Sequence, residues 1–261
     1  MVNEAFTAVQ QDDGVLELTL TRADRRNTID LDTAARIEEL LQEANLDKRV
    51  RALLITGQGR DFCTGAEVSP NATQMGPLDY RLATRKMTRM TQALWEIEKP
   101  VVSAVNGTVA GAGWMLALLA DLVVAAQGAR WTHVFARRGM VPHAGDTYFL
   151  PRILPFHQLM ELAFLSETVT SERLHQMGVI NRLAEPDQVV AAGRELAARL
   201  AAGPTRSLGF AKRLYRSSLG HDMTTAFNEE FDATALLSTT SDRAEGMRSL
   251  VEGRPPVFIG D

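Results

Sequence analysis

The sequence has only one cysteine, Cys63, in a chain of 261 residues. A single cysteine cannot form an internal disulfide bond, so we expect a reducing, cytoplasmic compartment. Cys63 lies in an apolar stretch, with no histidine or helix cap close to it in the sequence. We therefore expect a small buried side chain at this position and not a reactive thiol.

Targeting and membrane signals are also missing. The N-terminus lacks a basic stretch followed by an apolar core, so we expect no signal peptide. The longest apolar run, from Val109 to Ala126, is interrupted by Gly111, Gly113 and Asp121. It is barely long enough to cross a bilayer, so a buried helix that leads into a strand explains it better than a membrane span.

Neither charge nor motifs favour nucleic acid or metal binding. The formal net charge is -4, and no segment resembles a basic face, so we expect no nucleic-acid partner. The sequence has no H-E-x-x-H, no C-x-x-C and no paired-histidine spacing, so we expect no metal site. It also lacks the G-x-S-x-G motif of serine hydrolases.

What is present is an ordinary globular balance, 45% apolar and 23% charged residues, with short apolar strands between helical patterns. Alternation or continuous apolar runs predict strands, and three- to four-residue spacing predicts helices. The expected strands are 15–20, 52–57, 101–107, 121–126 and 178–183, and the expected helices between them are 31–44, 81–98 and 113–120. This alternation predicts an α/β core with buried strands.

From Glu185 onward the pattern is helical only. Four segments, 186–202, 204–218, 223–238 and 241–253, are separated by Gly, Pro or Asp/Ser breaks. We therefore predict an α/β core over residues 1–200 and a C-terminal helical region over residues 201–261. The segment 69–78 is rich in Pro, Asn and Gly, which predicts a loop.

Two glycine-bearing turns follow predicted strands, one over 57–69 and one over 105–121. Small residues let the backbone approach a ligand closely, and the first amides of a helix have no partner inside the helix. Such turns can bind an oxyanion or a phosphate. Each turn taken alone is explained equally well by tight packing, and neither completes the dinucleotide-binding G-x-G-x-x-G pattern.

Taken together and in this order, the motifs resemble the enoyl-CoA hydratase/isomerase (crotonase-like) superfamily. The matching segments are RRNTID (25–30), GRDFCTGAEVS (59–69), KPVVSAVNGTVAGAGWMLALLADLVVAA (99–126), RRGMVPHAGDTYFLPR (137–152) and EGMRSLVEGRPPVFIG (245–260). The resemblance implies a spiral of repeated ββα units and a C-terminal helical region used in trimerisation. It also implies an acyl-CoA thioester substrate, no cofactor besides the coenzyme A of that substrate, and a homotrimer or a dimer of trimers.

The resemblance also assigns residues. The thioester oxygen would lie between the backbone N–H groups of Ala66, which follows Gly65, and Ala112. The stretch from Ala66 through Glu67 and Val68 to Ser69 would line the path of the adenine and pantetheine groups. One of Arg22, Arg25 and Arg26 would meet the coenzyme A phosphates, and Lys212 or another basic residue of the helical tail could contribute from a neighbouring subunit.

The sequence departs from the family at the two glutamates that hydratases use, whose positions are occupied by Met115 and Phe135. Neither side chain can transfer a proton, and hydration needs a positioned acid and base. Other members carry one acidic residue after the Pro of a G-x-x-P-x-A-G segment. Here that residue is His143, which suits proton transfer, and Asp146 three residues later could orient it.

These residues lead to two classes of function. The first is an acyl-CoA enzyme that isomerises an enoyl-CoA, or hydrates or dehydrates it in an atypical way, with His143 or Asp146 as the proton-transfer group. The alternatives are a CoA-thioester-binding protein with little turnover and an acyl-CoA hydrolase. Trp114, Phe135 and Tyr148 predict a bulky apolar acyl group, and His133 is a further candidate for the acyl pocket.

Overall fold

The computed structural model describes residues 5–67 and 74–261, which form two sheets. The large sheet has the order β1-β2-β3-β5-β7-β10 and the small sheet the order β4-β6-β8-β9. The strands are β1 (Phe6–Gln10), β2 (Val15–Leu20), β3 (Ala52–Gly57), β4 (Asp61–Cys63), β5 (Val101–Val105), β6 (Thr108–Ala110), β7 (Leu122–Ala126), β8 (Arg130–Thr132), β9 (Thr168–Thr170) and β10 (Arg182–Ala184). Only the pairs β1–β2 and β8–β9 are antiparallel.

One unit repeats along the chain: a strand of the large sheet, a strand of the small sheet, then a helix. The units are β3-β4-α2, β5-β6-α3 and β7-β8-α4. The helices are α1 (Leu31–Leu46), α2 (Pro77–Glu96), α3 (Gly113–Leu118), α4 (Asp146–Ile153), α5 (Phe156–Leu165), α6 (Ser171–Gln176), α7 (Val189–Ala201), α8 (Thr205–Ser217), α9 (Met223–Leu237) and α10 (Ser241–Glu252). The predicted spiral of ββα units is confirmed.

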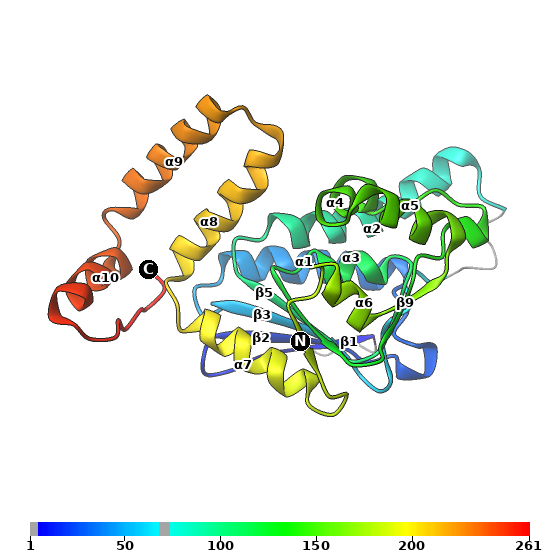
Figure 1. Cartoon of the computed structure of the whole chain (residues 1–261), viewed down its shortest axis with the longest axis horizontal. Coiled ribbons are helices and arrows are strands. Elements are labelled where there is room, and N and C mark those ends of the chain that lie inside the picture. Colours follow the sequence, from blue (N-terminus) through cyan, green and yellow to red (C-terminus); the bar gives the residue numbers. More distant parts are fainter. Residues whose placement is uncertain (1–4, 68–73) are drawn as a thin grey trace.

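Apolar layers cover both faces of the large sheet. Helices α1, α2 and α3 lie on one face and α7 on the other (Figure 1). Every residue of β3 is buried, as expected for a continuous apolar run between two layers. Ile55 belongs to the core on the α1–α3 side, whereas Leu54 packs with Leu196 and Ala197 of α7.

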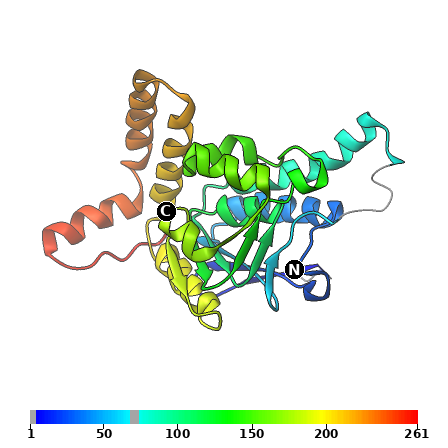
Figure 2. The same cartoon turned by 45° about the vertical axis from the view of Figure 1, so that its right-hand side comes forward.

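Helices α8, α9 and α10 form an arm that leaves the body of the molecule (Figures 1 and 2). The base of α8 is fixed to the core through Asp121, whose carboxylate accepts hydrogen bonds from Lys212 Nζ (2.8 Å) and Arg216 Nη2 (2.9 Å). The predicted helices after residue 185 are confirmed. The boundary near residue 200 stays a prediction.

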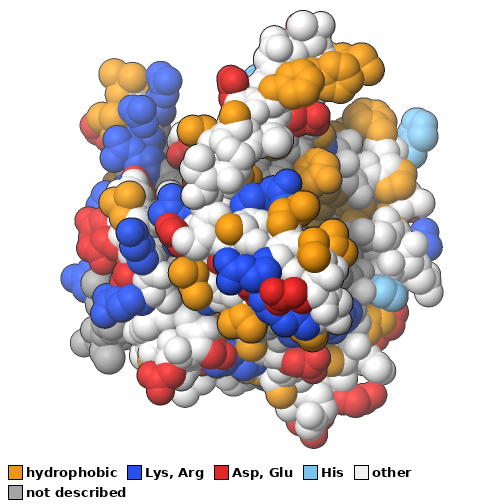
Figure 3. Space-filling model, turned by 90° about the vertical axis from the view of Figure 1, so that its left-hand side faces the viewer, with side chains coloured by type: hydrophobic (Ala, Val, Ile, Leu, Met, Phe, Trp, Pro, Cys, Tyr) orange, Lys and Arg blue, Asp and Glu red, His pale blue; other side chains and the backbone are white. Residues whose placement is uncertain are grey.

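Large apolar side chains are exposed on the arm of α8, α9 and α10. Figure 3 shows the side of the molecule on which this arm lies. They include Tyr215, Phe231, Leu250 and Val251, of which Val251 is 85% exposed. Exposed apolar side chains that gather on one element mark an interaction surface more often than isolated ones do.

The strands at 15–20 and 52–57 match the prediction residue by residue. The strand predicted at 178–183 is wrong in its first part, because Gly178 has a positive φ of 79° and lies in a turn, and β10 starts only at Arg182. The predicted loop 69–78 lies in part outside the described residues, and α2 begins within it at Pro77. No helix in the described ranges is long and apolar enough to cross a membrane.

Candidate active site

The first glycine turn leaves β4 in an extended conformation and pairs with the chain that precedes α1. Gly65 O accepts a hydrogen bond from Ile29 N–H (2.9 Å), and Glu67 N–H donates to Ile29 O (2.8 Å). Ala66 is therefore the residue opposite Ile29 in a parallel bridge. Because the amides of an extended segment alternate in direction, the Ala66 N–H points away from Ile29.

The second turn brings its backbone directly against Gly65. A Cβ atom added to Gly65 would lie 2.8 Å from Ala110 O and 3.0 Å from Ala112 N, and φ of Gly65 is +93°. Both facts require glycine here. A Cβ on Gly113 would lie 2.2 Å from Cys63 O, so α3 also begins in close contact with the first turn.

Ala112 has ordinary helical angles, φ -60° and ψ -17°, so an alanine causes no strain at this position. Helix α3 has six residues, which makes its dipole a minor contribution. In the part of the chain that the structure describes, neither the Ala66 N–H nor the Ala112 N–H has a hydrogen-bond acceptor. Two adjacent turns therefore each carry a backbone donor without an acceptor in the described structure.

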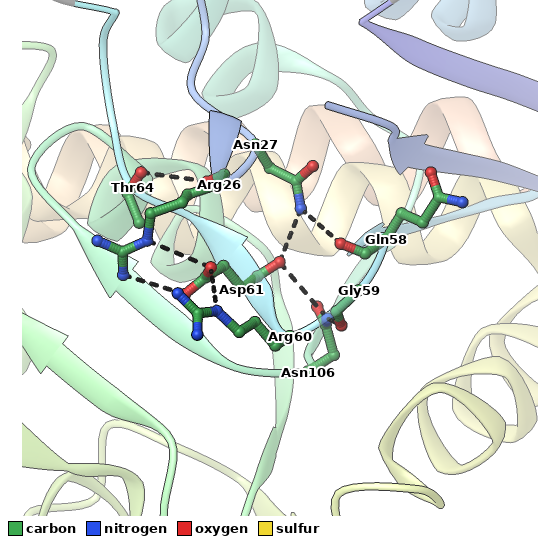
Figure 4. A network of polar contacts seen from close by, with 8 residues as sticks. All are labelled: Arg26, Asn27, Gln58, Gly59, Arg60, Asp61, Thr64 and Asn106. Atoms are coloured by element: carbon green, nitrogen blue, oxygen red, sulfur yellow. Dashed lines mark hydrogen bonds and ion pairs between the residues drawn. The ribbon is translucent and has the colours of Figure 1, made fainter. Parts of the chain in front are cut away.

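A polar network behind the first turn holds it in place (Figure 4). Arg26 donates to both oxygens of Asp61 (3.2 and 3.1 Å), and the buried Asn27 side chain donates to Asp61 O (2.7 Å) and Gln58 O (3.0 Å). Burial raises the pKa of Asp61, but hydrogen bonds from Arg26 and Thr108 outweigh it, so the pKa is lowered overall. The carboxylate thus stays charged and keeps the turn anchored.

The predicted coenzyme A contacts lie at the edge of this turn. Glu67 is bound by Arg22 Nη2 (2.7 Å) and Arg25 Nη1 (2.9 Å), so its carboxylate supports the turn. Arg25 is 57% exposed, and its predicted contact with a phosphate stays a prediction. Val68 lies outside the described residues.

The suggested contact of Lys212 with a ligand of a neighbouring subunit stays a prediction. In its own chain the Lys212 side chain is 8% exposed, and its ammonium group is bonded to Asp121 and to Lys99 O (2.9 Å). Burial lowers the pKa of Lys212 to about 8, although the nearby Asp121 carboxylate opposes the shift.

A cleft of about 330 Å³ opens beside Ala66. Its lining combines three arginines, one glutamate, four threonines and three small apolar residues: Arg26, Arg137, Arg138, Glu67, Thr28, Thr64, Thr108, Thr132, Ala66, Ala110 and Val134. Three cations against one carboxylate, together with the hydroxyl groups, suit the cleft to an anionic group.

The segment with His143 forms a tight turn before α4. Ala144 has a φ of +62°, an uncommon conformation for a residue with a Cβ, and such strain is often found at functional sites. His143 is half-buried, with its ring 5.0 Å from that of Phe135, and its Nδ1 lies 3.4 Å from Val141 O.

Asp146 does not orient His143 as predicted. The buried Asp146 carboxylate lies 2.9 Å from Nε2 of His133, which is also buried, and it has no contact with the His143 ring in the described structure. Because the chain turns at Ala144, the side chains of His143 and Asp146 point in different directions. His133, a lower-ranked candidate, is therefore the partner that sequence reasoning missed.

Buried rings connect this pair to the second turn. Ring centroids are 5.4 Å apart for Trp131 and Trp114, 6.0 Å for Trp114 and His133, and 5.0 Å for His133 and Phe135. Phe135 then reaches His143. A series of contacting rings therefore runs from Trp114, two residues after Ala112, to His143, the predicted proton-transfer residue.

The remaining predicted residues divide between two places. Met115 and Phe135 are buried near the turns and bring no titratable group to the hydratase positions. Tyr148 does not join them, because its exposed ring packs on Trp95 (6.2 Å) and under Arg152. Cys63 is fully buried, which raises the pKa of its thiol to about 12, so it is not a reactive thiol, as expected.

Known proteins are similar to this chain in sequence and in fold. The family model for enoyl-CoA hydratase/isomerase matches residues 10–261. The 1,2-epoxyphenylacetyl-CoA isomerase of Escherichia coli K12 is 33% identical over 95% of both chains, and its 2,3-dehydroadipyl-CoA hydratase is 30% identical over 97% of this chain and 98% of that one. The crystal structure of an enoyl-CoA hydratase from Polaromonas sp. JS666 superposes with a TM-score of 0.92, at 26% identity, over 97% of this chain and 99% of that one.

The spiral fold and its pair of facing turns define the class of acyl-CoA-acting enzymes with the crotonase fold. Within that class, the chain belongs to the enoyl-CoA hydratase/isomerase family, whose members are lyases and isomerases.

Proposed function

We propose that this protein moves a proton between carbons next to the thioester of an enoyl-CoA and so isomerises its double bond. The Ala66 and Ala112 N–H groups bind the thioester oxygen and stabilise the enolate that forms. His143 takes the proton from one carbon and returns it to another. Arg25, Glu67 and Gly65 belong to the binding path of the coenzyme A moiety.

One observation carries this proposal: two donors without acceptors on turns whose backbones touch. Gly65 approaches Ala112 N so closely that the Ala66 and Ala112 amides belong to one small region. Hydrogen-bond donors that are fixed before charge develops stabilise that charge without reorganising. A dense contact between turns that served packing alone would not leave both donors without acceptors.

Isomerisation is favoured over hydration because the hydratase positions hold Met115 and Phe135. Water addition needs one group to activate water and another to protonate the α-carbon. A proton shift needs a single group that accepts and returns one proton, and the half-buried His143 is such a group. The isomerase activity named for the E. coli relative is consistent with this choice.

Proton exchange in heavy water tests the proposal. Saturated and enoyl-CoA thioesters are incubated with the protein, and α- and γ-proton washout is followed by NMR or mass spectrometry. We expect washout at both carbons and movement of the double bond. A complete lack of exchange with every chain length would reject the proposal in favour of a binding protein with little turnover.

The donors are tested by Ala112→Pro, with Ala112→Gly as the matched control. Proline fits φ near -60° at the start of a helix and replaces the N–H hydrogen with a ring methylene, whereas glycine keeps the N–H. We expect the proline variant to lose about 10²–10³-fold in exchange rate and the glycine variant to lose far less. Equal rates would remove this donor from the mechanism. Should Ala112→Pro not fold, Ala66→Pro supplies the same test.

The base is tested by His143→Gln, which keeps a polar side chain of similar size. Loss of a positioned general base typically costs about 10²–10⁴-fold in rate. An unchanged exchange rate would show that another group transfers the proton. Retained exchange together with incorporation of labelled oxygen from water would favour atypical hydration, the second candidate reaction.

The assembly is a separate proposal. We propose that the exposed apolar side chains of α8–α10 pack on other copies of the chain in a homotrimer or a dimer of trimers. Mass measurement in solution tests it: a trimer or hexamer is expected, and a monomer at micromolar concentration would refute it.

A further inference from the structure

The most unusual feature outside the two turns is the buried pair of His133 and Asp146. Their side chains are 1% and 5% exposed, and Nε2 lies 2.9 Å from Oδ2. Burying such a pair is costly, and well-packed apolar residues would often be at least as stable. A carboxylate accepts hydrogen bonds, so the hydrogen that faces it is on Nε2 of His133. In the neutral ring, Nδ1 is then left as an acceptor.

Two polar atoms in this cluster have no partner. Among the described residues, Nδ1 of His133 and Nε1 of Trp114 are both buried and make no hydrogen bond. The two rings are in edge contact, with centroids 6.0 Å apart. Nδ1 accepts and Nε1–H donates, so a single hydroxyl group placed between them could satisfy both, by donating to His133 and accepting from Trp114.

The neighbouring Trp131 shows that a satisfied indole is attainable in the same cluster. Its ring is 5.4 Å from that of Trp114 and equally buried, yet its Nε1–H donates to Ser171 Oγ at 3.0 Å. The unpaired donor of Trp114 is therefore a property of that one position. A buried donor left without a partner costs about 1–3 kcal/mol, so its presence calls for an explanation.

We propose that Trp114 Nε1–H and His133 Nδ1 form an oxygen-binding end of the acyl pocket, with Asp146 as the positioning residue that fixes the His133 ring. The ligand is an acyl-CoA whose acyl group carries a hydroxyl group beyond the thioester, because the oxygen must accept from Trp114 Nε1–H and donate its own hydrogen to His133 Nδ1. Trp114 follows Ala112 by two residues, and both belong to the core cluster against which Ala66 packs. This inference rests on the proposed function, because it needs the thioester between Ala66 and Ala112.

The recognition has a physical rationale. A pocket that hydrogen-bonds an oxygen discriminates strongly against the analogue that lacks it, because both buried groups are then left unpaired. The rings around the two unpaired atoms are otherwise apolar, with Phe135 in contact with His133. The sequence predicts a bulky apolar acyl group. The proposed site adds that this acyl group carries one oxygen and is otherwise apolar along its length.

The experiment compares binding of plain hexanoyl-CoA with a series of hexanoyl-CoA thioesters that carry a hydroxyl group at successive chain positions. Dissociation constants are measured by calorimetry on the wild-type protein and on Trp114→Phe, His133→Phe and Trp131→Phe. We expect at least one oxygenated thioester to bind the wild type about tenfold or more tightly than the plain one, which corresponds to one or two hydrogen bonds.

The variants decide what causes the preference. Trp114→Phe and His133→Phe should reduce the ratio of the two dissociation constants to about one, and the matched control Trp131→Phe should keep it. Because Trp114→Phe is the milder change, it decides alone if His133→Phe does not fold. No preference in the wild type, or a preference that survives Trp114→Phe, would overturn the inference and leave a resident water as the partner of these atoms.

A failure of this inference can be told from a failure of the proposed function. Proton washout from plain hexanoyl-CoA by the wild-type protein reports only on the two backbone donors and the base. Washout without an oxygen preference rejects the oxygen-binding end alone, and absence of washout rejects the proposed function.

Discussion

Two buried polar regions of this molecule differ in how completely their groups are paired. At the base of the arm, the Asp121 carboxylate accepts from Lys212, Arg216 and Val101 N–H, and Arg216 also lies over the Trp95 ring. Behind the turns, His133 and Trp114 each keep an unpaired polar atom among the described residues. The groups of the Asp121 network are paired with one another, whereas the His133 and Trp114 side chains keep an unpaired acceptor and an unpaired donor, so the second region is the better candidate for pairing with a polar group of a ligand.

The largest effect is expected from Asp121→Ala, which breaks the hydrogen-bonded network of Asp121, Lys212 and Arg216. This change leaves Lys212 and Arg216, which are 8% and 14% exposed, without their shared counterion. Removing one partner of a buried ion pair costs about 3–5 kcal/mol. Urea unfolding of the variant should show a loss in that range, while the turnover per folded molecule is retained. A loss below about 1 kcal/mol would show that the network contributes little to stability.

The next effect concerns pH. The pKa of Lys212 falls from 10.5 to about 8 in the folded protein, chiefly because the group is buried. Between these values the unfolded chain binds the proton and the folded one releases it, so stability rises with pH. The rise should approach about 1 kcal/mol per pH unit between pH 8 and 10. The Lys212→Met variant should lack this rise in stability. Equal slopes of the free energy of unfolding against pH for wild type and variant would contradict the lowered pKa of Lys212.

The two tryptophans sharpen the comparison within one cluster. Trp131→Phe and Trp114→Phe remove the same volume from adjacent buried sites, but only Trp131 loses a hydrogen bond and leaves Ser171 without it. Trp131→Phe should therefore destabilise the free protein by about 1–3 kcal/mol more than Trp114→Phe does. Thermal unfolding of both variants without ligand measures the difference. Equal losses would mean that the Trp114 N–H is paired in solution.

The smallest effect is expected at the edge of the first turn. Glu67→Gln weakens the ion pairs with Arg22 and Arg25, of which Arg25 is largely exposed. Half-exposed pairs of this kind contribute about 0–1 kcal/mol, and salt screens them. The difference in stability from wild type should shrink further in high salt. A loss well above 1 kcal/mol would place Glu67 among the groups that determine the fold.

Much of the fold could be predicted because long apolar patterns report burial directly. The strand at 52–57 is a continuous apolar run, and the structure covers it on both faces. The small sheet was not predicted, because strands such as β4 and β8 have three residues each and too few positions to show a period. Their backbone pairing is set by the turns between them.

Only the part of the candidate site that consists of backbone groups could be predicted from the sequence. Gly65, Ala66 and Ala112 follow strands in recognisable turns, and the structure places the backbones of these turns in contact. The partner of Asp146 was not predictable from spacing. His143 is nearer in the sequence. With Ala144 in the left-handed conformation, however, the Asp146 carboxylate contacts His133, which is thirteen positions away. The only available signal was the position of His133 just after β8.

A crystal structure with a bound, unreactive acyl-CoA analogue tests the central claim most directly. We predict that the thioester oxygen lies between the Ala66 and Ala112 N–H groups, at about 2.7–3.1 Å from each nitrogen. A thioester oxygen bound to any other group, or a carbonyl that reaches neither amide, would contradict the proposed reaction.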